Sequence, residues 1–139
     1  MTFEYLEVIN HGLVVSLSTN VQFTFQNVTF TNSGGKAIQL TAISSSTTNL
    51  LVEYCTFQYS ADSALVYLVS SGVQSSPIIS VKNTVFKEAN IGNPNDLILI
   101  QHVGTGNLTL NLDTVDFSDH MLSGTTSTDA RLFAVSSTV

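Results

Sequence analysis

Apolar and polar residues alternate in a short pattern that returns several times along the chain. The clearest copy is Phe23–Phe30, where apolar residues alternate with polar ones on both sides of Asn27. Related copies occupy Leu50–Phe57, Ile79–Phe86, Leu110–Phe117 and, less regularly, Met1–Val8. A period of two is typical of β-strands, because successive side chains of a strand point to opposite faces. Each copy therefore predicts a pair of short strands joined by a turn.

The copies recur at a spacing that favours a solenoid. Their last residues are separated by 22, 27, 29 and 31 positions: Val8, Phe30, Phe57, Phe86 and Phe117. Repeats of this length are typical of arrays in which one unit buries its apolar face only against the next. A coil of 22 residues has no room for a strand, a crossover helix and another strand. We therefore predict an all-β fold, a parallel β-helix of about five rungs, uncapped at both ends.

Equivalent residues of successive rungs should lie above one another in columns. Three inward columns are predicted, and all of their members are apolar: Met1, Phe23, Leu50, Ile79 and Leu110; Phe3, Phe25, Val52, Val81 and Leu112; and Val8, Phe30, Phe57, Phe86 and Phe117. A turn column is predicted at Tyr5, Asn27, Tyr54, Asn83 and Thr114. Asparagine tolerates the left-handed backbone conformation that such a turn requires.

A second apolar run follows most copies, and several of these runs are apolar on both faces. They include Ala64–Val69, Leu97–Ile100 and Leu132–Val135. One face must fill the core, and the other would form an interface, because strands that are apolar on both faces are normally covered on both. The predicted interface residues are Val14, Leu65, Tyr67, Ile98, Ile100 and Phe133. The alternative is that some runs turn corners and share both faces with the core.

Composition limits the classes of protein that fit. The 139 residues are enough for one domain with a core, and we assign residues 1–139 to a single β-helix domain. Only 10% of residues are charged, and the net charge of −6 argues against nucleic-acid binding. The longest apolar runs are too short to span a membrane. Because neither end shows a cap, we expect these residues to be a segment of a longer chain or to stack end-on with a neighbour.

The segment Phe30–Ile38 carries a resemblance to a known family. Phe30-Thr31-Asn32 and Gly34-Gly35-Lys36-Ala37-Ile38 resemble the Phe-x-x-Asn and Gly-Gly-Ala-Ile repeats of polymorphic outer membrane protein-type β-helices, although Asn32 comes one residue early and Lys36 interrupts the second motif. More broadly, the chain is similar to the right-handed, pectate-lyase-like β-helix superfamily. The resemblance implies a right-handed coil and a surface or secreted adhesin-like module, and it transfers no catalytic residue.

Few residues suggest chemistry. The densest polar cluster is Asp113, Asp116, Asp119 and His120. Carboxylates of this kind suit Ca²⁺, but no Lys or Arg neighbours them to act as a base, and solvated surface acids are the default interpretation. The three histidines, His11, His102 and His120, have no metal-ligand spacing and are interpreted as turn residues. The single cysteine, Cys55, is predicted to point inward as a small apolar residue.

Two glycosylation sequons occur, at Asn27 and Asn107, and we expect Asn107 to be the better acceptor because it lies in a turn. The function predicted from these features is a non-enzymatic structural or adhesive β-helix segment of an extracellular or cell-surface protein, such as a filament component. The alternative is a carbohydrate-active or glycan-binding β-helix module. No cofactor is predicted, and the expected partner is another protein or the remainder of the same chain.

Overall fold

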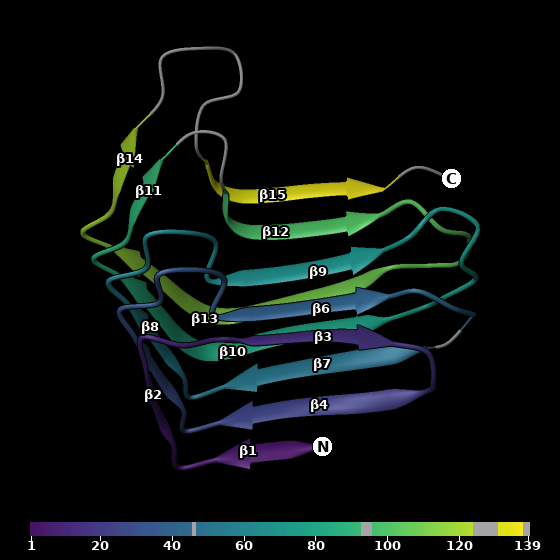
Figure 1. Ribbon diagram of the computed structural model, residues 1–139, viewed down its shortest axis with the longest axis horizontal. Helices are drawn as coiled ribbons and strands as arrows, with labels where there is room; N and C mark the ends of the chain where they lie inside the picture. Colours follow the sequence, from purple (N-terminus) through teal and green to yellow (C-terminus); the bar gives the residue numbers. More distant parts are fainter. Residues whose placement is uncertain (46, 93–95, 124–130, 138–139) are drawn as a thin grey trace.

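The chain winds into a β-solenoid of about four turns, all of whose strands pair in parallel (Figure 1). The computed structural model describes residues 1–45, 47–92, 96–123 and 131–137. Within these residues there is no helix, and so none that could cross a membrane. The predicted β-helix is confirmed at this level of architecture.

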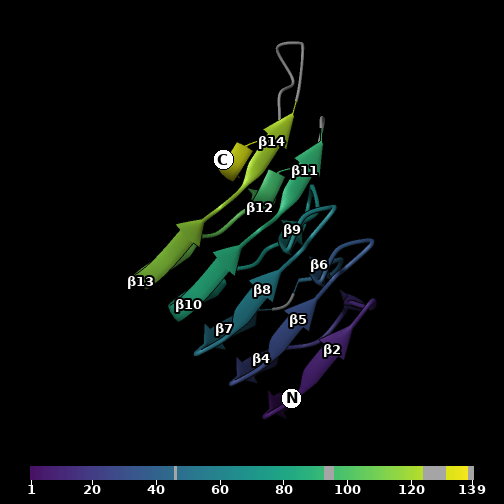
Figure 2. The same ribbon diagram turned by 90° about the vertical axis from the view of Figure 1, so that its left-hand side faces the viewer.

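The first sheet contains eight strands and bends through a corner, so that it forms two faces of the coil (Figure 2). One face holds β1 (Thr2–Glu4), β4 (Val21–Gln26) and β7 (Thr48–Glu53), and the other holds β2 (Glu7–Ile9), β5 (Thr29–Thr31) and β8 (Thr56–Gln58). The longer strands β10 (Ile78–Lys87) and β13 (Thr109–Ser118) pass through the corner and contribute to both faces.

The second sheet closes the coil. Its five strands lie in the order of their levels: β3 (Leu13–Leu17), β6 (Ile38–Ala42), β9 (Leu65–Val69), β12 (Asp96–His102) and β15 (Arg131–Ser137). A short pair, β11 (Asn90–Gly92) and β14 (Met121–Ser123), extends the upper levels. The strands of this sheet match the second apolar runs predicted from the sequence.

The predicted inward columns are confirmed by the strand register. Phe25 pairs with Phe3 below and Val52 above, and Phe57 lies between Phe30 and Phe86 in its own column. The rings of this column stack nearly parallel, with centroids 4.9 Å apart for Phe30–Phe57 and 4.7 Å apart for Phe57–Phe86. Members in the middle levels are fully buried, whereas Met1 and Leu112, at the two ends, are 68% and 45% exposed.

The corners are made by left-handed residues, as predicted for the turn column. Tyr5, Asn27, Tyr54, Asn83 and Thr114 all have φ between 46° and 54°. A second left-handed column closes the other end of the same face, with φ between 52° and 59°, at Asn10, Asn32, Tyr59, Glu88 and Asp119. This second column was not predicted from the sequence, although each member follows its landmark residue by two positions.

The predicted interface on the second sheet is largely wrong. Leu65, Tyr67, Ile98 and Ile100 are buried in the core. Phe133 packs partly buried against that core, and only Val14 points outward, 65% exposed. The prediction is off by one residue, because the register pairs Leu65 with Ile38 and Ile98, so that Val66 and not Leu65 continues the column of Val14. Val66 is itself only 1% exposed, so β9 is buried on both faces at this level.

Candidate functional site

A shallow groove crosses the outer surface of the first sheet. Its volume is about 240 Å³, and it lies on β4, β7 and β10. Because alternate residues of a β-strand point to opposite faces, every second residue of these strands points outward. Most of the groove is built from these outward residues. The lining residues are Gln22, Asn49, Leu50, Leu51, Ile78, Ser80 and Lys82. The groove therefore combines amide, hydroxyl and ammonium groups with an apolar floor.

Hydrogen bonds hold two of the polar groups in place. The side-chain oxygen of Asn49 accepts a hydrogen bond from the backbone N–H of Ile78 at 2.9 Å, so its amide NH₂ is the end left for other partners. Ser80 Oγ accepts a hydrogen bond from Asn111 Nδ2 at 3.2 Å. These bonds run between neighbouring levels of the stack, so the groove is held by the solenoid itself.

Lys82 occupies the register position between two carboxylates. It pairs with Glu53 below and Asp113 above, as the outward column predicted. Within the part of the chain that the structure describes, however, the salt bridge found is between Lys36 and Asp62. Glu53 accepts a hydrogen bond from Gln26 at 3.2 Å, and Asp113 accepts one from Thr114 at 3.0 Å. Lys82 is one of the residues that line the groove.

The acidic residues of the last level divide between faces. Asp113 and Asp116 are exposed on β13, on opposite sides of the left-handed residue Thr114. Asp119 forms the next corner with φ of 55°. In the described residues, no group of three or more His, Cys, Asp or Glu side chains could hold a metal ion. The bends therefore turn neighbouring acids towards different sides of the coil.

The histidines differ from one another. His11 is exposed, but His102 is 1% exposed, and its Nε2 lies 3.0 Å from the carbonyl oxygen of Ser75. The interpretation of His102 as a turn residue is wrong, because it ends strand β12 inside the coil. His120 accepts a hydrogen bond from the Ala89 N–H through Nδ1, and burial lowers the pKa of its imidazole.

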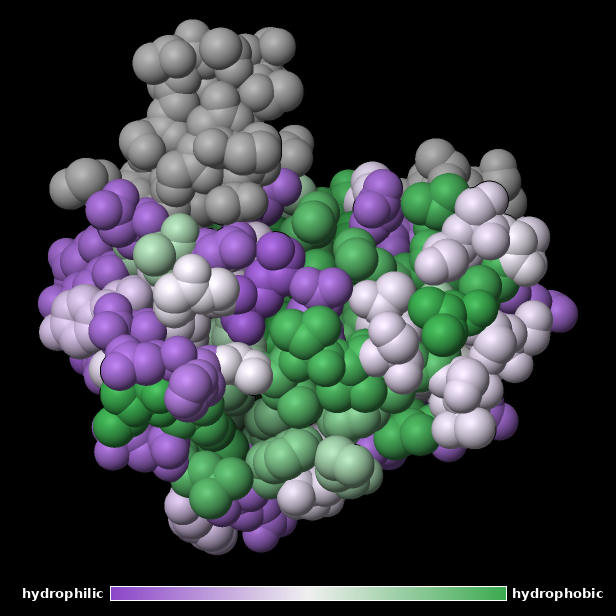
Figure 3. Space-filling view, in the orientation of Figure 1, coloured by the Kyte–Doolittle hydropathy of each residue, from purple (hydrophilic) through white to green (hydrophobic). Residues whose placement is uncertain are grey.

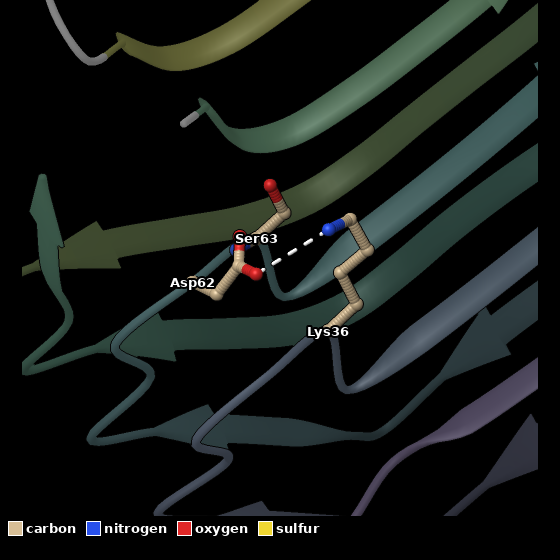
Figure 4. Close-up of polar contacts among 3 residues, drawn as sticks. All are labelled: Lys36, Asp62 and Ser63. Carbon is tan, nitrogen blue, oxygen red and sulfur yellow. Dashed lines mark hydrogen bonds and ion pairs between the residues drawn. The ribbon is translucent and has the colours of Figure 1, made fainter. Parts of the chain in front are cut away.

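A charged contact joins two neighbouring loops (Figure 4). Lys36 Nζ lies 3.3 Å from Asp62 Oδ2, and the other oxygen of Asp62 accepts a hydrogen bond from the Ser63 N–H at 2.6 Å. Both charged side chains are partly exposed, so the pair adds about 0–1 kcal/mol. Lys36 interrupts the Gly-Gly-Ala-Ile motif, and its ion pair with Asp62 joins its own level of the coil to the next.

Cys55 is a buried thiol, as predicted. It is 1% exposed, and its Sγ lies 3.4 Å from the Phe25 carbonyl oxygen and 3.3 Å from the Glu53 carbonyl oxygen. Burial raises the pKa of the thiol, which keeps it in the unreactive protonated form.

Both sequon asparagines are exposed. Asn27 lies at a left-handed corner, and the backbone N–H of Asn107 donates to Ser76 Oγ at 3.2 Å. Exposure therefore favours neither asparagine as the glycosylation acceptor, and glycosylation of either stays a prediction.

Exposed tyrosines mark the corners beside β8. Tyr54 and Tyr59 lie at the two ends of this strand, with 53% and 49% of their surfaces exposed, and Tyr5 at the lowest level is 78% exposed. The Tyr59 hydroxyl bonds to the Glu88 carboxylate of the next level, which raises the pKa of Tyr59. These rings offer rigid, amphipathic contact surface on the outside of the coil.

No protein family, curated protein or solved structure matches this chain. The stacked parallel coils agree with the β-solenoid architecture that the resemblance to known β-helices implies. The finer resemblance, to polymorphic outer membrane protein-type repeats or to the pectate-lyase-like superfamily, stays a prediction.

Proposed function

We propose that this chain is a non-enzymatic structural and adhesive segment of an extracellular or cell-surface protein. The proposal rests on one observation: the inward columns continue in register from the first level to the last. Each level thus supports the next, and the coil forms a stiff scaffold whose outward residues are presented in regular rows. The exposed corner tyrosines are the residues on these rows that suit contact with another surface.

Incubation with polysaccharides tests the structural role against a catalytic one. The 139-residue chain is mixed with acidic and neutral polysaccharides, with and without Ca²⁺, and newly formed polysaccharide chain ends are measured. We expect no cleavage. Cleavage that disappears in a triple variant, Asp113→Asn with Asp116→Asn and Asp119→Asn, would refute the non-enzymatic role and place the reaction at the last level.

Adhesion is tested on the tyrosines. Beads that carry the chain are allowed to settle on cell surfaces, and the force needed to detach them is compared with that for a Tyr54→Ser/Tyr59→Ser variant. Because both rings are about half exposed, the variant should keep its fold while adhesion falls. Equal detachment forces would contradict an adhesive role for this face.

Glycan binding is the second candidate, and the groove on the first sheet favours it. Amide, hydroxyl and ammonium groups around an apolar floor can donate hydrogen bonds to sugar hydroxyls while the floor packs against a sugar ring. Calorimetric titration with neutral and uronic acid oligosaccharides tests it with Lys82→Gln. The matched control is Lys87→Gln, which removes the same charge from the same strand beyond the corner. Binding that both variants lose equally would assign the effect to net charge and not to the groove.

A further inference from the structure

The first level of the solenoid ends in an apolar hollow. It has a volume of about 230 Å³ and is lined mainly by side chains of the first two levels, including Phe3, Leu6, Val8, Leu13 and Phe25. Leu6 is 45% exposed although it faces this hollow. The lower edge of β1 is the corresponding edge of the first sheet, since β1 pairs with β4 on its other side.

The opposite end presents the continuation of the same columns. Leu112 on β13 and Val135 on β15 are each 45% exposed, and they are the last described members of inward columns. β13 pairs with β10 on one side, and β15 pairs with β12. Figure 1 shows β1 at the lower end of the first sheet and β15 at the upper end of the second.

A second copy placed head to tail would continue this register. All strand pairs in the coil are parallel and run in the same direction from level to level. The lower edge of one copy therefore has the pairing geometry that the upper edge of another requires. Leu112 would face Phe3 of the next copy, and Phe117 would face Val8.

Charges oppose this contact at two positions. Inside the coil, like charges never follow one another in the two outward columns: Glu4, Gln26, Glu53, Lys82 and Asp113; and Glu7, Thr29, Thr56, Val85 and Asp116. Both columns begin and end with a carboxylate. In a head-to-tail stack Asp113 would face Glu4 of the next copy, and Asp116 would face Glu7, at a spacing of about 4.8 Å.

Other charged groups near the joint do not neutralise these pairs. Lys82 lies one level below Asp113. The α-amino group of Met1 donates to the Gln22 carbonyl. At the next corner Asp119 would face Asn10 of the next copy, since both are left-handed corner residues of the same column. On the second sheet Arg131 pairs with Asp96 of the level below.

We propose that the two end levels are the surfaces of a head-to-tail contact between copies of this chain, and that the facing carboxylates Glu4/Asp113 and Glu7/Asp116 oppose that contact. Like charges directly opposite on neighbouring strands are destabilising. The inference rests on the proposed structural function, to which it adds the partner, a second copy, and the control of assembly.

Charge reversal at one facing pair tests the proposal in the intact chain. Asp116→Lys places a cation opposite Glu7 of the next copy, with only Val85 beneath it. Assembly is followed by sedimentation velocity at neutral pH and low salt, where the wild type should remain monomeric. D116K should assemble at a concentration at least about tenfold lower than any at which the wild type assembles. The double variant E7K/D116K restores like charges at the joint and should be monomeric again.

The double variant E7K/D116K distinguishes an effect of the facing charges at the contact from an effect of the net charge of the chain. It is less negative than D116K, so assembly driven by reduced net charge would increase in it, and that result would overturn the proposal. Failure of D116K to assemble while its circular dichroism spectrum stays native would also overturn it, as would wild-type assembly at the same concentration as D116K. A control double variant, Glu53→Gln with Glu88→Gln, removes two charges away from the ends and should stay monomeric. None of these outcomes depends on polysaccharide cleavage, so the proposed function is tested separately.

Discussion

Replacing Phe57 by alanine should be among the most damaging changes to this fold. Phe57 is 1% exposed and lies at the middle of the phenylalanine column. Its ring stacks on Phe30 at 4.9 Å and on Phe86 at 4.7 Å. Truncating a buried Phe costs about 3–5 kcal/mol, and because both stacking partners are lost, we expect about 4–5 kcal/mol here. This is about a quarter or more of the stability of a typical domain, about 5–15 kcal/mol.

Phe117 provides the matched comparison at the end of the same column. It is partly buried and stacks on one ring only, that of Phe86 at 5.3 Å. Phe117→Ala should therefore cost about 2 kcal/mol. Phe57→Leu, which keeps most of the buried volume but loses both stacks, should cost about 1–2 kcal/mol.

Equilibrium unfolding in urea, followed by far-ultraviolet circular dichroism, measures these three losses. A solenoid is stabilised by contacts between neighbouring levels, so the transition of each variant must first be shown to be two-state by a second probe. Similar losses for Phe57→Ala and Phe117→Ala would show that stacking on both sides does not add to burial. That result would refute the reasoning from the column.

Two further predictions concern a glycine and the thiol. A Cβ on Gly104 would meet the backbone oxygen of Val73, so Gly104→Ala should destabilise the fold by about 2 kcal/mol or more in urea unfolding. Gly34→Ala, with open space around it, should change the unfolding free energy by no more than about 0.5 kcal/mol in the same assay. Because burial raises the pKa of Cys55, the unfolded chain ionises first as pH rises. Stability should therefore fall above the ordinary thiol pKa of about 8.5, and Cys55→Ala should remove part of that loss. A thiol reagent should modify Cys55 only after unfolding, and rapid modification of the native chain would contradict its burial.

The first sheet was predictable because its alternation is unambiguous. In Phe23–Gln26 every second residue is polar, so only one register buries the apolar set. The turn column was predictable for a related reason, since Asn27 and Asn83 mark positions where a left-handed residue is tolerated. The tyrosines of that column gave no such signal, and their φ values follow from their place in the stack.

The second sheet shows where the pattern fails. Ala64–Val69 is apolar throughout, so a shift of one residue leaves an equally apolar set on either face. The correct face was decided by pairing with β6, where Ile38 and Leu40 point inward and Gln39 and Thr41 point outward. The buried position of His102 was likewise hidden, because it depends on a strand that continues past the apolar run.

The groove on the first sheet could not be found from the chain alone. Gln22, Asn49 and Ser80 are far apart in sequence, and each is an ordinary polar residue on the outward face of its own strand. Only the stacking of levels brings them together.

The sequence by itself determined that this protein coils, how many residues each turn holds, and which side chains fill the first sheet's inner face, because a period of two and a recurring landmark are local properties of the chain. The tertiary structure decided which side chains of the uniformly apolar strands point into the core, which side chains meet across levels, and which carboxylates lie on the two end levels. These outcomes depend on pairing between strands 22 or more residues apart, and such pairing is fixed by packing in three dimensions.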